Sequence, residues 1–138
     1  ARQARYAAMA GWCRANAVAL LLTAHHADDQ AETLLMRLAR GSGLSGLSGI
    51  RARLELDGVT VLRPLLGVRR MELAEIVRAA GWTPVDDPTN RDPAHDRTWA
   101  RALLADAGWI SAERVAAAAA NLADAQAALD WAEARAFG

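Results

Sequence analysis

The feature that most constrains the fold is a short, uninterrupted apolar run at residues 18–23, directly followed by a polar cluster and a helical segment. Such a run is typical of a strand that is covered on both faces in a parallel sheet. The polar cluster then lies at the carboxyl end of this strand, which is the edge where ligands bind in open α/β sheets. The sequence therefore predicts an α/β fold with a ligand site at that edge.

The rest of the chain alternates between helical patterns and short strands. Asp57-Gly58 is the dipeptide that a type I′ turn prefers, so a β-hairpin with strands at 51–56 and 59–62 is expected. A glycine-rich stretch at 41–46 should end a helix, and a further short strand is expected at 83–85. Helices are expected at residues 1–15, 28–40, 72–80, 99–107 and 111–136.

The last of these helices carries its own packing pattern. Ser111 is a good N-cap for it. Val115, Leu122 and Leu129 recur every seven residues, and an alanine stands three residues after each. We expect this seam to pack against another helix.

Composition sets limits on size and location. A chain of 138 residues with 53% hydrophobic content suffices for one domain with its own core, or for part of a larger one. Its formal net charge is zero, so no overall field draws it to nucleic acid or to a membrane. Cys13 is the single cysteine and cannot form an internal disulfide, and no signal peptide or membrane-spanning run is recognisable in these residues. A cytoplasmic location is expected.

The polar cluster at residues 25–33 is the main candidate for a functional site. On a helix, Asp28, Asp29 and Glu32 fall within one third of the circumference, on a face expected to point away from the core. Asp29 and Glu32 also have the spacing of a capping box, which is a purely structural explanation. The neighbouring His25 and His26 favour a binding site, because a satisfied core histidine explains one imidazole but not two. A cation, an amine or a phosphate-bound magnesium would suit such a cluster.

Other motifs are less specific. The histidine spacing does not match HExxH, and a His-Asp phosphohydrolase would need more histidines than the remaining His95. The glycine-rich stretch fits neither a P-loop nor a dinucleotide fingerprint. Arg97 and Arg101 lie one helical turn apart, which suits two phosphates or a carboxylate but also a solvated helix face.

Four motifs in order make a more specific pattern than any of them alone. They are HHADDQAET at 25–33, RGSGLSGL at 40–47, RPLL at 63–66, and DPTN at 87–90 with Arg97 and Arg101 after it. This arrangement closely resembles the bacterial tRNA(Ile)-lysidine synthases, and the similarity covers nearly the whole chain. Arg5 and Tyr6 also resemble the helix that precedes the first motif in that family.

The resemblance implies a Rossmann-like ATP pyrophosphatase fold, with a parallel sheet, flanking helices and a long C-terminal helix. It implies ATP and Mg²⁺ as cofactors. The implied partners are free L-lysine and a tRNA(Ile) with a CAU anticodon, with no membrane, and a homodimer is a candidate assembly. In the implied reaction, ATP adenylates the C2 oxygen of the wobble cytidine, and the ε-amine of lysine then displaces AMP to give lysidine.

The resemblance also assigns roles to residues. Paired acids can hold a cationic amine and help remove its proton, a histidine can stabilise phosphate charge, and arginines can form bidentate contacts. The implied residues are His25, Asp29 and Glu32 for catalysis, Arg5, Asp28, Arg97 and Arg101 for substrate binding, and Arg40, Gly41 and Gly43 for cofactor binding, with no metal ligand.

One family motif, the Ser-Gly-Gly-x-Asp-Ser pyrophosphate loop, does not occur in these residues. We therefore expect residues 1–110 to be the second half of the catalytic domain and 111–138 to be a helix leading toward tRNA-binding domains. Alone, the chain should be inactive. Two alternatives stay open: a tRNA 2-thiolation enzyme of the same superfamily, which usually relies on cysteine pairs, and a non-enzymatic helical interaction module.

Overall fold

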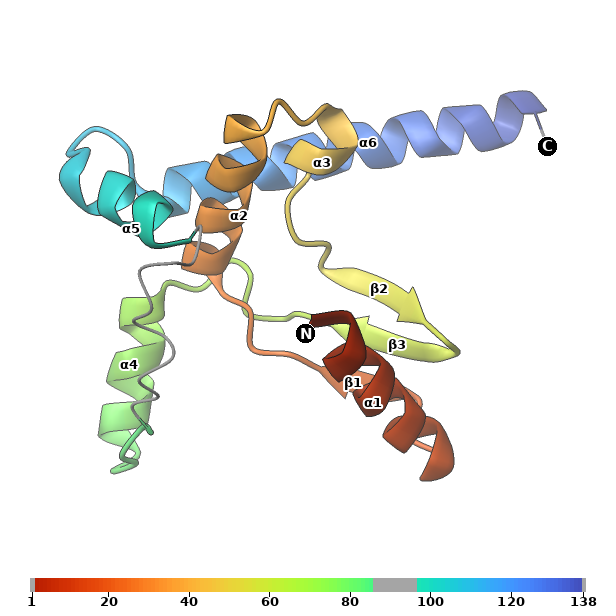
Figure 1. Cartoon of the computed structure of the whole chain (residues 1–138), viewed down its shortest axis with the longest axis horizontal. Helices are drawn as coiled ribbons and strands as arrows, with labels where there is room; N and C mark the ends of the chain where they lie inside the picture. Colours follow the sequence, from red (N-terminus) through yellow and green to blue (C-terminus); the bar gives the residue numbers. More distant parts are fainter. Residues whose placement is uncertain (1, 86–96, 138) are drawn as a thin grey trace.

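The computed structural model describes residues 2–85 and 97–137 as helices around a small sheet (Figure 1). The fold is α/β, as expected. In chain order the elements are α1 (Arg2–Ala15), β1 (Leu20–Leu22), α2 (Ala27–Ala39), α3 (Leu44–Leu47), β2 (Arg53–Leu56), β3 (Val59–Leu62), α4 (Arg70–Ala79), α5 (Arg97–Asp106) and α6 (Ala112–Phe137).

The sheet of the described residues has three strands in the order β1-β3-β2. β1 and β3 are parallel, with Leu21 opposite Val61, whereas β2 and β3 form an antiparallel hairpin. Asp57 and Gly58 have φ values of 50° and 79°, as the two central residues of a type I′ turn require. The hairpin prediction is therefore confirmed, and the sheet is mixed rather than purely parallel.

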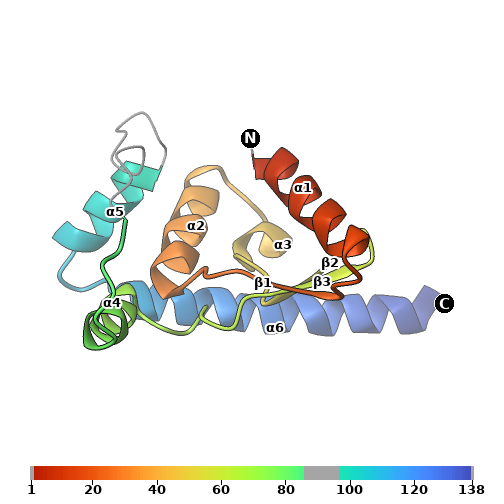
Figure 2. The same cartoon turned by 90° about the horizontal axis from the view of Figure 1, so that it is seen from below.

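Helix α1 lies over one face of the sheet (Figure 2). A small hydrophobic core fills the space between the helix and the strands. Ala10 and Cys13 of α1 pack with Val59 of β3. On β1, Leu20 and Leu22 are 46% and 59% exposed. The expectation of a strand covered on both faces is therefore wrong for the described residues, because no described element packs on the outer side of these leucines.

The start of α2 is fixed by a capping box between His26 and Asp29. The backbone N–H of His26 donates to Asp29 Oδ2 (3.1 Å), and that of Asp29 donates to His26 Nδ1 (3.4 Å). The alternative explanation of a capping box between Asp29 and Glu32 is wrong, because His26 is the N-cap and Asp29 takes the third position of its box. At its other end α2 stops before Gly41, whose φ of 68° confirms the predicted helix end.

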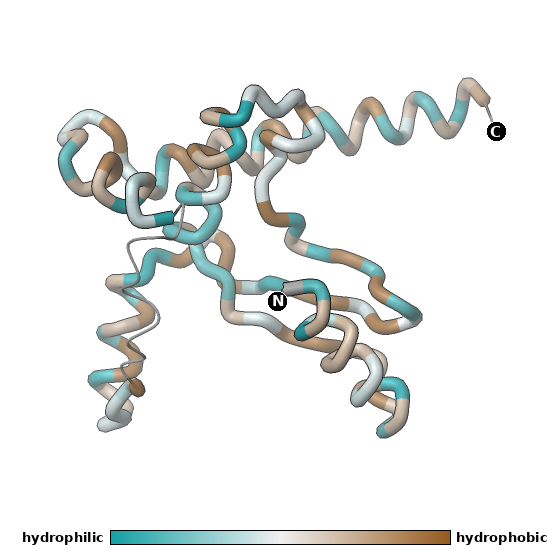
Figure 3. The backbone as a smooth tube through the Cα atoms, in the orientation of Figure 1, coloured by the Kyte–Doolittle hydropathy of each residue, from teal (hydrophilic) through white to brown (hydrophobic). Residues whose placement is uncertain are grey.

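The long helix α6 crosses α2 and α3 (Figure 1). Ser111 Oγ accepts a hydrogen bond from the backbone N–H of Arg114 (3.2 Å), which confirms the predicted N-cap. Figure 3 shows hydrophobic residues recurring along the whole helix. Its buried residues, however, are the alanines at 112, 116 and 119, whereas Leu129 is 56% exposed. The predicted seven-residue seam is therefore wrong. Val115 and Leu122 are only half-buried, and the alanines at 118 and 125 are exposed. The helix instead buries small alanines on a neighbouring face, which lets α2 approach closely.

Two smaller predictions also have clear outcomes. Residues 83–85 form no strand, and α4 ends before Gly81, which has a φ of 70°. The predicted DPTN motif at 87–90 and His95 lie outside the described residues. None of the described helices is long and apolar enough to cross a membrane.

Candidate functional site

The carboxyl ends of β1 and β3 meet at one edge of the sheet, as parallel pairing requires. The backbone N–H of Thr23, just after β1, donates to the carbonyl of Leu62 in β3 (3.0 Å). Thr23 Oγ1 lies 3.0 Å from His25 Nδ1, so this hydroxyl fixes the orientation of the imidazole. His25 is therefore held at the edge where the sequence placed the ligand site.

His26 and two acids form the next layer of the site at the start of α2. His26 Nδ1 lies 3.6 Å from Asp28 Oδ2, and His26 Nε2 lies 3.6 Å from Asp29 Oδ2. Asp28 Oδ2 also accepts a hydrogen bond from the backbone N–H of Arg70 (2.8 Å). The first turn of α2 is thereby tied to the start of α4, which lies 42 residues further along the chain.

Glu32 and Arg101 form the tightest ion pair of the site. Arg101 Nε donates to Glu32 Oε1 (2.6 Å) and Arg101 Nη2 to Glu32 Oε2 (3.5 Å). Arg97 lies one turn earlier on α5, and its Nη1 is 3.3 Å from Asp29 Oδ1 and 3.9 Å from Glu32 Oε2. The Glu32 side chain is only 4% exposed. The expectation that the acids point away from the core is therefore wrong for Glu32, because α5 packs over it.

These ion pairs act on the protonation of Arg101. Its hydrogen bond to Glu32 raises the pKa of Arg101 above its ordinary value. Burial works in the opposite direction, and the charges of Glu32, Asp29 and Asp28 add to the increase. Arg101 therefore stays positively charged and pairs with the acids of α2.

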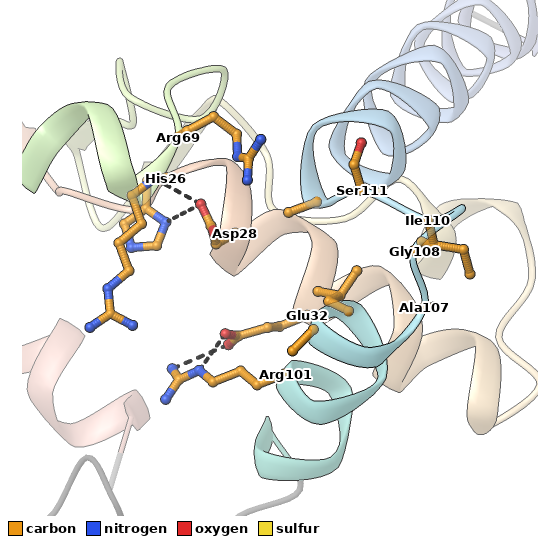
Figure 4. A pocket seen from close by; sticks show the side chains of 13 residues that line it. His26, Asp28, Glu32, Arg69, Arg101, Ala107, Gly108, Ile110 and Ser111 are labelled. Atoms are coloured by element: carbon orange, nitrogen blue, oxygen red, sulfur yellow. Dashed lines mark hydrogen bonds and ion pairs between the residues drawn. The ribbon is translucent and has the colours of Figure 1, made fainter.

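A pocket of about 540 Å³ opens beside this ion pair (Figure 4). One side carries both signs of charge: Figure 4 shows Glu32 and Arg101 facing each other, with His26, Asp28 and Arg69 further along the wall. The other side is mostly apolar and comes from the α5–α6 connection. The pocket thus combines anionic, cationic and apolar surfaces within one space.

Three lining residues with ionisable side chains had no predicted site role: His26, Arg69 and Arg70. Arg69 Nε is buried and has no hydrogen-bond acceptor among the described residues. The backbone N–H of Arg69 donates to Glu72 Oε2 (2.7 Å), so Arg69 begins α4. Arg69 and Arg70 lie just before the helix predicted at 72–80, and this arginine pair was the sequence signal for this side of the pocket.

Four predicted residues lie away from the acids. Arg5 is exposed on α1, and no hydrogen bond or ion pair between described residues joins it to the cluster. Arg40, Gly41 and Gly43 follow the far end of α2, about 17 Å from Asp29 by the helical rise. A Cβ added at either glycine would meet no atom within 4 Å, so the backbone there is open to a ligand.

The described residues do not offer a ready metal centre. In the part of the chain that the structure describes, no three side chains of His, Cys, Asp or Glu are arranged to hold a metal ion. The acids of α2 are engaged by Arg97, Arg101 and a backbone N–H instead. This donor set favours binding of charged organic groups.

Comparison with known proteins gives a consistent result. A family model described as the PP-loop domain matches residues 1–107. Among similar proteins are tRNA(Ile)-lysidine synthases from Zymomonas mobilis and Novosphingobium aromaticivorans, each 50% identical over 135 residues. These alignments cover 95% and 96% of this chain, respectively, and 41% of each relative. A tRNA(Ile)-lysidine synthase from Ruegeria pomeroyi is 48% identical over 133 residues, which are 95% of this chain and 32% of that relative.

These matches confirm the resemblance drawn from the four motifs. They also show that the similarity covers only part of these relatives, because the chain spans less than half the length of the curated relatives that it matches.

Proposed function

The chain belongs to the PP-loop domain family, and on that premise we propose that it contributes the substrate-binding part of an enzyme that forms lysidine in tRNA(Ile) with a CAU anticodon. The observation that carries the proposal is the cluster of acids on α2, paired with arginines on α5, beside a pocket of both charges. That arrangement suits an amine nucleophile that must be bound, oriented and deprotonated.

The proposed reaction has two steps. In the first, the C2 oxygen of the wobble cytidine attacks the α-phosphorus of ATP, the bond to the β-phosphate oxygen breaks, and pyrophosphate leaves. In the second, the ε-amine of lysine attacks C2, the bond from C2 to the adenylate oxygen breaks, and AMP leaves. The amine loses one proton in this step, which a carboxylate of the site can accept.

Lysine fits the surfaces of the pocket. Asp28 and Glu32 supply negative charge for an ammonium group, while Arg101 and Arg69 supply positive charge for the carboxylate. The buried Nε of Arg69, which lacks an acceptor among the described residues, is a donor available for that carboxylate. The apolar wall from the α5–α6 connection suits the methylene stem of lysine.

Asp29 is the proposed proton acceptor. Its side chain is 17% exposed, whereas that of Glu32 is 4% exposed and held by Arg101. Glu32 would then act mainly by orienting Arg101 and by stabilising positive charge near it. His25, held by Thr23 at the sheet edge, would stabilise phosphate charge during the adenylation step.

The remaining assignments rest on the resemblance. Arg97 and Arg5 would bind the cytidine or the lysine carboxylate, and Arg40, Gly41 and Gly43 would contact ATP. A Rossmann-like arrangement of the whole catalytic domain is part of the proposal. Mg²⁺ would enter with ATP, since the described residues form no metal centre of their own.

The proposal extends to the organisation of the protein. Residues 1–110 would belong to the catalytic domain, and α6 would lead toward tRNA-binding domains. The proposed location is the cytoplasm, and a homodimer is the proposed assembly. A 2-thiolation enzyme is disfavoured, because Cys13 is 3% exposed and packs from α1 against β3, where it cannot reach a substrate.

The test is ATP-dependent incorporation of labelled lysine into tRNA(Ile) with a CAU anticodon by the full-length gene product. Incorporation that requires ATP, and that disappears when the wobble cytidine is replaced by uridine, supports the proposal. Release of pyrophosphate without any transfer of lysine would contradict it, because a different nucleophile would then be the substrate.

A further inference from the structure

Three arginines surround a second cavity, of about 300 Å³, which shares no lining residue with the pocket beside Glu32. It lies between the end of α2, α3 and the β2–β3 hairpin. Its lining includes Arg37, Arg51, Arg63 and the Ser45 side of α3, and none of the described residues that line it is acidic. We propose that this cavity binds a phosphate group, independently of the lysine pocket described above.

Arg63 is the central residue of this cavity because it is 5% exposed and has no counter-ion among the described residues. Its Nη1 donates to the carbonyl of Arg51 (2.6 Å) and its Nη2 to the hydroxyl of Tyr6 (3.2 Å). Both acceptors are neutral. Among the described residues no carboxylate lies within 4.0 Å of this guanidinium, and its buried Nε has no acceptor. A buried cation without a compensating charge is unfavourable, so the site is poised to gain an anion.

The rim of the cavity is held in place. Arg37 Nη1 donates to the carbonyls of Gly46 (2.5 Å) and Gly49 (2.8 Å). The backbone N–H of Ile50 donates to Gln30 Oε1 (2.5 Å), and Gln30 Nε2 donates back to the Ile50 carbonyl (3.1 Å). The loop after α3 is thus fixed to α2 before any ligand arrives, which lowers the entropy lost on binding.

The chemistry of the cavity favours a phosphate over a carboxylate. Guanidinium groups form planar, paired hydrogen bonds with phosphate oxygens, and several converging arginines match a group with more than one charged oxygen. Arg63 directly follows β3, so the cavity lies near the same carboxyl edge of the sheet as Thr23. That edge is a common location for phosphate-bearing ligands in α/β folds.

The phosphate can come from a free pyrophosphoryl compound or from an RNA backbone, and two probes separate these sources. Isothermal titration calorimetry of the purified 138-residue chain would use inorganic pyrophosphate in one series. A second series would use a single-stranded RNA hexamer without terminal phosphates, which offers phosphodiesters alone. The chain has no Ser-Gly-Gly-x-Asp-Ser loop that would bind pyrophosphate elsewhere.

The variants are Arg63→Gln and Arg51→Gln, with Arg53→Gln as the matched control. Arg53 lies on the same hairpin but pairs with Glu55 and does not line the cavity. We expect at least one probe to bind, with an affinity that falls about tenfold or more in the two cavity variants and less than twofold in the control. Arg51 is exposed, so Arg51→Gln should fold normally. Its affinity therefore tests the proposal even when Arg63→Gln does not fold.

Preference for pyrophosphate identifies a small-molecule site, and preference for the hexamer identifies an RNA contact. Absence of binding by both probes would overturn the proposal, as would equal affinity in Arg51→Gln and Arg53→Gln. Neither readout involves lysine, ATP turnover or tRNA. Failure here is therefore distinct from failure of the proposed lysidine synthesis.

Discussion

Arg101 Nε lies 2.6 Å from Glu32 Oε1, although 69 residues separate the two side chains in the sequence. This contact joins α5 to the turn of α2 that follows the histidines, and Arg97 adds a looser contact to Asp29 from the same helix. Asp29 and Glu32 are therefore paired with arginines that lie far away in the sequence.

Replacing Asp29 by asparagine should impair lysine transfer far more than folding. The amide keeps the size of the side chain but cannot accept a proton, so we expect a loss on the order of 10²–10⁴ in the rate of lysidine formation. The measurement is labelled-lysine incorporation by the full-length gene product. Asp57→Asn is the matched control, since Asn tolerates the positive φ at this turn. An Asp29→Asn variant with normal activity and a lowered melting temperature would show that Asp29 only caps helix α2 and does not take part in the reaction.

Replacing Arg97 by lysine should behave as a loss of function despite the retained charge. An ammonium cannot reproduce the planar fork of the guanidinium, so a bidentate contact to substrate is lost. We expect about a tenfold or larger decrease in kcat/KM, measured at subsaturating lysine and tRNA. Unchanged kcat/KM in this variant would remove Arg97 from the substrate-binding set.

The Glu32–Arg101 pair should show strong energetic coupling. Arg101→Gln leaves a nearly buried carboxylate with Arg97 as its remaining cation at 3.9 Å, which should cost about 3 kcal/mol in the free energy of unfolding. The double variant Glu32→Gln/Arg101→Gln should be less destabilised than the sum of the single variants, with a coupling on the order of 1–3 kcal/mol.

Urea unfolding of the four proteins in this cycle gives the coupling. The exposed pair Arg53–Glu55 provides a comparison cycle, for which a much weaker coupling is expected because solvent screens both charges. Equal coupling in the two cycles would mean that burial adds nothing to the Glu32–Arg101 contact.

Gly49→Ala should be more destabilising than Gly81→Ala, although both positions have nearly the same φ, 68° and 70°. Left-handed backbone costs alanine about 1–2 kcal/mol at either site. At Gly49 the new Cβ would also lie 2.5 Å from Gln30 Oε1 and displace the Gln30 amide from Ile50, whereas at Gly81 it meets open space. The expected difference in the free energy of unfolding is about 1–3 kcal/mol, measured by urea denaturation. Equal losses would show that the Gln30–Ile50 contact adjusts freely.

Local patterns predicted those parts of the fold that local chemistry determines. Asp57-Gly58 predicted the hairpin and Ser111 the start of the last helix, because turn dihedrals and capping depend on a few adjacent residues. The burial of Glu32 could not be predicted in this way. A helical projection of α2 shows which residues share a face, but it does not show that α5 returns to cover that face with arginines.

Packing between distant segments also explains the other differences between the predicted and the observed structure. Residues 18–23 are apolar enough for an inner strand, yet the neighbours that would cover them are a property of the whole sheet and not of the run itself. Arg69 and Arg70 are recognisable in the sequence as an arginine pair, but their place in the pocket depends on the packing of the start of α4 beside Asp28.

β1 pairs with β3 on one side, and in the described sheet its other side has no neighbour. The unpaired backbone donors and acceptors there, together with Leu20 and Leu22, form an open template for another strand. In concentrated solution this template will recruit strands from other molecules, so the purified chain should form soluble aggregates whose size rises with protein concentration. Handling the chain at low concentration, or with a peptide that pairs along β1, should keep it monomeric.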